Sequence, residues 1–102
     1  MFDKLFIKMN LNKFIKNNKE EFTFNDLYKV IKSKDAFDLV EVLADFVIDG
    51  KLIQFIKVKS PLSNQIYYYN SIFEVTDTIL DNDKQEYFRV LPEDCIIVYR
   101  KG

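Results

Sequence analysis

The sequence predicts a single α+β domain of 102 residues, and three observations lead to that class. Apolar residues recur at helical spacing through the first half of the chain. After Gly50 the pattern changes to short runs rich in β-branched and aromatic residues, which are typical of strands. The composition is 48% hydrophobic and 16% aromatic, so one compact core is feasible at this length.

The first eighteen residues predict a helix with two apolar stripes on roughly opposite sides. The stripes consist of Phe2, Leu5, Phe6 and Met9 and of Ile7, Leu11, Phe14 and Ile15. Two explanations fit. The helix breaks near Asn10, which could cap a new turn, or it is continuous and one stripe faces a partner. If the Ile7 stripe is unburied in the monomer, it forms a patch for a homodimer or for another protein.

A second helix is predicted to begin after Thr23. With Thr23 as N-cap, Asp26 occupies the third helical position, which is an acidic variant of the capping box. Phe22 and Leu27 then occupy the two positions of a hydrophobic staple. We expect this helix to end near residues 33–34.

A third helix is predicted to begin after Asp35, with Asp38 at its third position. Gly50 follows it at the position where a left-handed residue commonly ends a helix. The predicted buried stripe consists of Ala36, Leu39, Val40, Leu43, Phe46 and Val47.

The rest of the chain is predicted to be β-rich. A strand over 52–59, a turn over 60–64 and a returning strand over 65–73 form a hairpin. Residues 74–83 either extend the strand or form a short helical turn, and a polar loop covers 81–84. A strand over 86–90 and a last strand over 95–99 follow, and the last strand pairs with 86–90 or with the hairpin.

The order of these elements resembles a winged helix-turn-helix domain over residues 1–73. The resemblance is carried by Thr23–Leu27 and by Leu39–Leu52, where Phe46 takes the second leucine position of the pattern Leu-x-x-Leu-x-x-x-Gly-x-Leu. It implies a three-helix winged-helix-like core with a β-hairpin wing, and residues 74–102 then form a β-rich C-terminal extension. In that superfamily the third helix is usually the DNA-recognition helix, but winged helices also serve as protein-docking modules.

The charge distribution argues against DNA recognition by the third helix. The net charge is +4 over residues 1–34, −5 over 35–50, +3 over 51–73 and −3 over 74–102. Carboxylates on the predicted outer face of the helix would repel phosphate, and base recognition needs Arg, Lys, Asn or Gln. This outer face is predicted to comprise Asp38, Glu41, Asp45 and Asp49, with Val42 among them.

Two interpretations of the acidic face stay open: a solvated surface, or a docking surface in which the carboxylates form a rim around Val42. We expect a non-catalytic protein–protein interaction module, an adaptor or a small subunit of an intracellular assembly, that docks through the third or the first helix. The alternative is a DNA-binding regulator that contacts phosphate through Lys57, Lys59 and the N-terminal helix, although Lys57 and Lys59 also suit the protection of an edge strand. The N-terminal lysines are interpreted as solubility charges: Lys4, Lys8, Lys13, Lys16 and Lys19.

The composition also excludes several kinds of chemistry. With no His and one Cys, the chain lacks imidazole-based catalysis, Cys/His zinc sites and an internal disulfide. Two glycines leave no glycine-rich phosphate loop, and the carboxylates of Asp81, Asp83 and Glu86 lack the spacing of an EF-hand. Cys95 begins an apolar run and is expected to be a buried structural thiol. We therefore expect no enzyme activity, cofactor or metal.

The expected location is cytoplasmic. No apolar run is long enough to cross a bilayer, and the first residues do not form a signal peptide, so we expect no membrane partner. A single Cys fits a reducing compartment.

Overall fold

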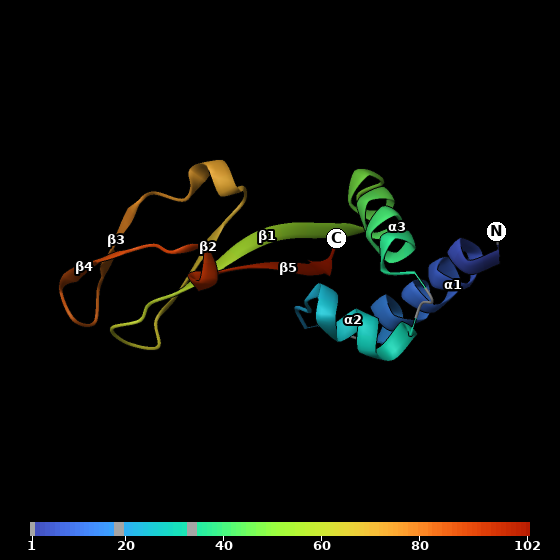
Figure 1. The fold of residues 1–102 in the computed structure, drawn as a ribbon, viewed down its shortest axis with the longest axis horizontal. Coiled ribbons are helices and arrows are strands. Elements are labelled where there is room, and N and C mark those ends of the chain that lie inside the picture. Colours follow the sequence, from blue (N-terminus) through green and yellow to red (C-terminus); the bar gives the residue numbers. More distant parts are fainter. Residues whose placement is uncertain (1, 18–19, 33–34) are drawn as a thin grey trace. The chain divides into compact units, whose positions relative to one another are not determined.

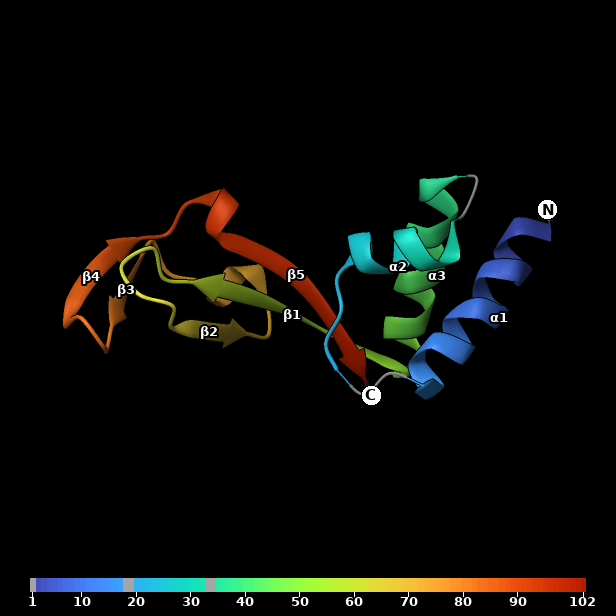
Figure 2. The ribbon, with the colours of Figure 1, turned by 90° about the horizontal axis from the view of Figure 1, so that it is seen from below.

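The computed structural model describes residues 2–17, 20–32 and 35–102, and the side chains from Lys4 onward in these ranges. It confirms the mixed α+β class (Figures 1 and 2). The elements are α1 (Phe2–Asn17), α2 (Phe24–Ile31), α3 (Ala36–Ile48), β1 (Leu52–Lys59), β2 (Ile66–Tyr69), β3 (Thr78–Asp81), β4 (Glu86–Arg89) and β5 (Cys95–Lys101). Short 3-10 turns cover Ile72–Glu74 and Pro92–Asp94.

The strands form two sheets, with the orders β2-β1-β5 and β3-β4. β1 and β2 are antiparallel, with Ile56 opposite Tyr69, and β3 and β4 are antiparallel, with Ile79 opposite Phe88. Of the two predicted partners for the last strand, the hairpin is the one observed, since β5 lies beside β1.

Two predicted segments differ from the structure. The returning strand was expected over 65–73 but ends at Tyr69, because Ser71 caps a 3-10 turn by accepting a hydrogen bond from the Phe73 N–H at 3.2 Å. Asp81, expected in a polar loop, is instead the last residue of β3. Its carboxylate accepts hydrogen bonds from the backbone of the following turn and so fixes where the hairpin reverses.

The chain divides into two compact units. The helical unit lies within residues 1–54 and 99–102, and the strand unit spans residues 55–98. β1 and β5 contribute residues to both units.

The core of the helical unit is built from leucine, isoleucine, valine and phenylalanine on all three helices, and α1 packs against α2 and α3. In α3 the predicted burial of Leu39, Leu43 and Phe46 is confirmed. Val42 is only 1% exposed, so the expectation that it lies on the outer face is wrong. Val42 follows Leu39 by three residues and precedes Phe46 by four, which places it on their side of the helix.

The Ile7 stripe of α1, considered as a possible surface patch, faces the core. Ile7 and Leu11 are fully buried, Ile15 is buried and Phe14 packs half-buried against the same core, so these four residues form no surface patch. The homodimer that an unburied Ile7 stripe would favour therefore loses its basis. The exposed apolar residues are instead Leu5, Phe6 and Met9, each more than half exposed.

The helix does not break at Asn10, which was one of the two explanations for its stripes. The Asn10 side chain donates a hydrogen bond to the Phe6 carbonyl oxygen at 2.7 Å, within a continuous helix. An asparagine that bonds back to the preceding turn is compatible with a helix interior, so it caps nothing here.

The predicted start of α2 is confirmed. The Asp26 N–H donates to the Thr23 hydroxyl oxygen at 3.2 Å, and the Thr23 N–H donates to the Asp26 carboxylate at 2.9 Å. Both staple residues, Phe22 and Leu27, are buried in the helical core. α2 ends at Ile31, and the expected end at residues 33–34 lies outside the described residues.

The end of α3 also follows the prediction. Gly50 has a φ of 76°, and its N–H donates to the Val47 carbonyl at 3.1 Å. The Lys51 N–H donates to the Phe46 carbonyl at 2.9 Å, which completes a Schellman motif. At the start of α3 the Asp35 side chain accepts a hydrogen bond from the Phe37 N–H at 2.9 Å. Asp35 and Asp38 do not form a capping box.

Phe22, in the segment between α1 and α2, links the helices to the end of β5. It exchanges two backbone hydrogen bonds with Tyr99, at 2.9 and 2.8 Å. The Phe22 ring stacks on the Tyr99 ring at 5.9 Å and meets the Phe14 ring edge-on at 5.0 Å. This contact brings the last residues of β5 to the helices.

The strand unit has a smaller apolar core, in which Ile56, Val58, Ile79 and Phe88 are buried. Tyr67, Tyr69 and Cys95 are among the half-buried residues that pack against it. No helix in the described part of the chain is both long and apolar enough to cross a membrane.

Candidate functional site

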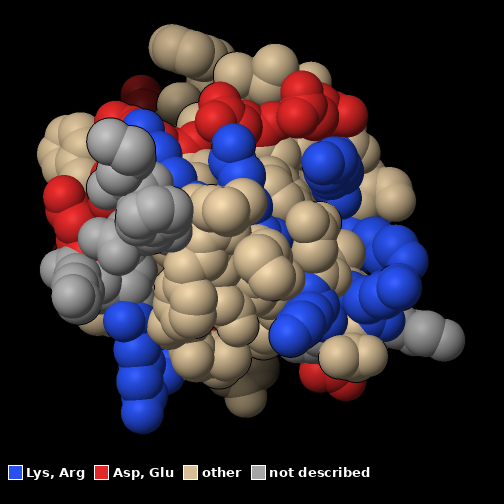
Figure 3. Space-filling model, turned by 90° about the vertical axis from the view of Figure 1, so that its right-hand side faces the viewer, with Lys and Arg blue, Asp and Glu red and all other residues tan. Residues whose placement is uncertain are grey.

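The solvent-facing side of α3 carries the carboxylates that the sequence predicts there. Glu41, Asp45 and Asp49 are exposed and Asp38 is half-buried, so the predicted outward orientation agrees with the structure. In Figure 3 acidic side chains form a row along the top of the view, where α3 lies in Figure 1.

An exposed apolar stripe runs beside this acidic row. Phe37 is 72% exposed, Val40 50% and Ile48 80%. Phe37 and Ile48 are eleven residues apart, about three helical turns, so they lie almost in line along the helix. We call Phe37, Val40, Glu41, Asp45 and Ile48 together the α3 outer face.

Sequence reasoning missed this stripe. It assigned Val40 to the buried side and gave Phe37 and Ile48 no role. A signal was present, because neither Phe37 nor Ile48 fits the buried periodicity of Leu39, Leu43 and Phe46.

The negative charge of α3 acts on the neighbouring helix. Lys4 of α1 forms an ion pair with Glu41. The hydrogen bond and the charge of Glu41 raise the pKa of the Lys4 ammonium above its usual 10.5, and Asp38 and Asp45 add to the effect. Because both side chains are about half exposed, the pair contributes little to stability.

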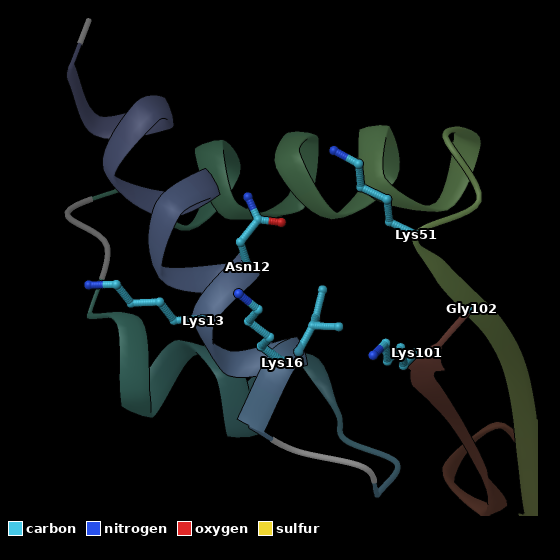
Figure 4. Close-up of a pocket in the computed structure, with 7 residues that line it drawn as sticks. Asn12, Lys13, Lys16, Lys51, Lys101 and Gly102 are labelled. Carbon is cyan, nitrogen blue, oxygen red and sulfur yellow. The ribbon is translucent and has the colours of Figure 1, made fainter.

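A second feature of the helical unit is a hollow of about 470 Å³ on another part of its surface. We call it the basic hollow. Its lining residues come from α1, from Lys51 just before β1, and from the end of β5 with the following Gly102 (Figure 4). They are Asn12, Lys13, Ile15, Lys16, Lys51, Lys101 and Gly102.

Backbone contacts hold the β-strand side of the basic hollow together. The Gly102 N–H donates to the Lys51 carbonyl at 3.0 Å, and a Cβ on Gly102 would collide with the Gly50 carbonyl. The Lys51 ammonium lies 5.0 Å from the centre of the Phe46 ring, a cation–π contact. Figure 4 shows Lys16 on the α1 side and Lys101 on the β5 side, with the Lys13 amino group pointing outward at the rim.

No local pattern in the sequence indicates this grouping of lysines. Lys13 and Lys16 were interpreted as solubility charges, and Lys51 and Lys101 lie far from them along the chain. The Phe22–Tyr99 pairing links the segment after α1 to β5, the Gly102 N–H bonds to the Lys51 carbonyl, and no local spacing predicts either contact. Lys19, which was grouped with the N-terminal lysines, lies outside the described residues.

The lysines proposed for phosphate contact in the alternative function lie in the strand unit. Lys59 is exposed opposite Ile66, and Lys57 is half-buried opposite Tyr68. Their contact with nucleic acid stays a prediction.

The strand unit contains one buried carboxylate, Asp81. It accepts hydrogen bonds from the Ser60 hydroxyl, from the Ser63 hydroxyl at 2.6 Å, and from the N–H groups of Asp83 and Lys84 at 2.9 and 3.0 Å. Burial alone would raise the pKa of Asp81, but these hydrogen bonds outweigh burial and lower the pKa to about 2. The carboxylate therefore acts as a structural acceptor.

The described residues include no group of three or more His, Cys, Asp or Glu side chains that could hold a metal ion. Cys95 is half-buried and lies at one side of a largely apolar hollow of about 620 Å³ in the strand unit. Burial, with a smaller effect of Asp94, raises the pKa of the Cys95 thiol and favours its unreactive neutral form.

Comparison of the chain with protein-family models, with curated proteins and with solved structures finds no match in any of the three. The candidates for function are therefore the α3 outer face and the basic hollow, judged by their own chemistry.

Proposed function

We propose that this protein is a non-catalytic protein–protein interaction module that docks a partner on the α3 outer face. The observation that carries the proposal is the exposed apolar stripe of Phe37, Val40 and Ile48 beside the carboxylates of Glu41 and Asp45. Large apolar side chains gathered on one exposed helix face are typical of binding surfaces.

The apolar stripe supplies what the sequence interpretation had assigned to Val42. Val42 is in the core and takes no part. Phe37 and Ile48 are largely exposed, and they lie in the first and the last turn of α3. A partner that covers both ends would bury apolar area over the whole helix, which is the main source of binding free energy.

Charge complementarity identifies the chemistry of the partner. The acidic row lies on one side of the stripe, so a partner surface with apolar residues in the centre and Lys or Arg at one edge fits it. An amphipathic helix with a basic side has this chemistry. The same carboxylates disfavour DNA as the occupant of α3, because they would lie close to phosphate.

We further propose a winged-helix-like arrangement for the three helices and the hairpin. The order of α1, α2 and α3 followed by the antiparallel pair β1 and β2 supports it. In such an arrangement α3 occupies the place of the recognition helix, and its acidic outer face favours a protein there.

The test is affinity capture of proteins from the native host with two double variants of the full chain. Glu41→Lys with Asp45→Lys reverses the charge of the face, and Phe37→Ala with Ile48→Ala removes its exposed apolar groups. The proposal expects at least one protein retained by the wild type and reduced about tenfold or more by each double variant, since central interface residues dominate binding.

Glu86→Lys with Glu93→Lys is the matched control, because it makes the same change in net charge at exposed residues of the strand unit. It should leave capture unchanged. Purified partner and protein should then bind directly, through a partner segment that is both apolar and basic. The proposal is wrong if no captured protein distinguishes the α3 variants from the control, or if the partner segment is acidic.

A further inference from the structure

The basic hollow is rich in lysine. Of the seven described residues that line it, four are lysines, and none of the seven has a carboxylate side chain. Among the described residues, Lys13, Lys16 and Lys101 form no ion pair, and Lys51 faces the Phe46 ring. Ammonium groups that share a hollow repel one another, and an anion between them replaces repulsion with attraction.

The geometry favours an anion with more than one charged group. Lys16 of α1 and Lys101 of β5 lie on different sides of the hollow, and Lys51 lies just before β1 with its ammonium group over the Phe46 ring (Figure 4). The lysine ammonium binds phosphate oxygens as a point charge with three donors. The Asn12 side-chain amide adds a neutral donor, and Ile15 contributes the apolar part of the wall.

The size of the hollow favours a small molecule. Its volume of about 470 Å³ lies within the usual range of small-molecule sites. A duplex backbone would extend beyond the hollow over a unit that also carries the carboxylates of α3, which repel phosphate.

We propose that the basic hollow binds the linked phosphates of a small oligophosphate, such as inorganic tripolyphosphate or the triphosphate of a nucleotide. The ammonium groups of Lys16 and Lys101 contact separate phosphates, and Lys13 and Lys51 add charge at the rim.

The experiment is titration calorimetry of the full chain with inorganic tripolyphosphate at low ionic strength, where charge screening is weak. The test variant is Lys16→Gln with Lys101→Gln, which removes one charge from α1 and one from β5. We expect it to weaken binding about tenfold or more, because each substitution removes a charge-assisted hydrogen bond.

The matched control is Lys8→Gln with Lys29→Gln, which makes the same charge change at two exposed lysines outside the hollow. It should change the affinity by less than about twofold, since screened charges at a distance act weakly. If circular dichroism shows that Lys101→Gln disturbs the fold, Lys13→Gln with Lys16→Gln tests the same site from α1 alone.

Three outcomes overturn the proposal. The first is no measurable binding of tripolyphosphate by the wild type. The second is an equal loss of affinity in the test and control variants, which would assign binding to overall charge. The third is tight binding of a DNA duplex that depends on Lys16 and Lys101 without binding of tripolyphosphate, which would make a nucleic acid the source of the phosphate. Titration with a nucleoside triphosphate then shows whether a base adds affinity to the phosphates.

Discussion

The helical unit and the strand unit are stabilised by different interactions. Among the described residues, the helical core has eleven buried apolar side chains from three helices, the Phe22 segment and β1. The corresponding strand core has four. The strand unit also has a buried polar centre at Asp81, whereas the described buried residues of the helical unit are all apolar.

This difference bears on where function lies. Apolar packing inside the helical unit does not require the side chains on its surface. Exposed apolar residues of α3 and the lysines of the basic hollow are therefore not needed for that packing. In the strand unit a few hydrogen bonds determine the turn geometry, so its polar residues are largely engaged in structure. Stability measurements can test this division directly.

The largest expected effect is on the helical core. Leu11→Ala removes a fully buried side chain and should lower the free energy of unfolding by about 2–5 kcal/mol. Leu5→Ala is the matched control on the same helix at a residue that is 58% exposed, and it should cost no more than about 0.5 kcal/mol. Urea unfolding followed by circular dichroism measures both. Equal effects would mean that the two stripes of α1 do not differ in burial.

The pair Leu11 and Leu5 also shows where prediction from sequence ended. Spacing separated the two stripes of α1, and it predicted the cap at Thr23 and the left-handed Gly50. Local patterns decide those features, because caps and stripes involve residues a few positions apart. Which stripe faces the core depends on where α2 and α3 pack, and no local pattern contains that information.

The same limit applies to the candidate sites. The outward carboxylates of α3 were predictable from helical periodicity alone. The predicted buried stripe of α3 was rotated about the helix axis toward Val40. As a result Val40, which is exposed, was predicted to be buried, and Val42, which is buried, was predicted to face outward. The basic hollow combines residues of α1, Lys51 and the last residues of the chain. Its formation depends on long-range contacts such as the Phe22–Tyr99 pairing, which no local pattern predicts.

A smaller effect is expected at the polar centre of the strand unit. Asp81→Asn removes the charge that four donors share and should lower the melting temperature less than Leu11→Ala does. Amide hydrogen exchange should show the loss of protection in β3 and β4, with α1–α3 unaffected. Equal loss in the helices would contradict the separate stabilisation of the two units.

The pH dependence gives this prediction a sign. The pKa of Asp81 is lowered from 3.8 to about 2 in the folded protein, so the folded state favours the ionised form. Its contribution to stability is complete above pH 3.8 and is lost as the pH falls toward about 2. The strand unit of the wild type should lose exchange protection over this interval, and Asp81→Asn should remove that part of the acid sensitivity.

The smallest expected effect concerns the start of α2. Thr23→Ala removes the hydroxyl that accepts the Asp26 N–H and should cost about 1 kcal/mol, the usual value for an N-cap. Thr23→Ser keeps the acceptor and should retain most of the stability, which separates the cap from the loss of the methyl group. Because Phe22 precedes the cap and carries the pairing with Tyr99, fraying of α2 should also weaken protection of the Phe22 and Tyr99 amides. If Thr23→Ala destabilises α2 and leaves those two amides protected, the bridge to β5 is held by the aromatic stack rather than by the helix start.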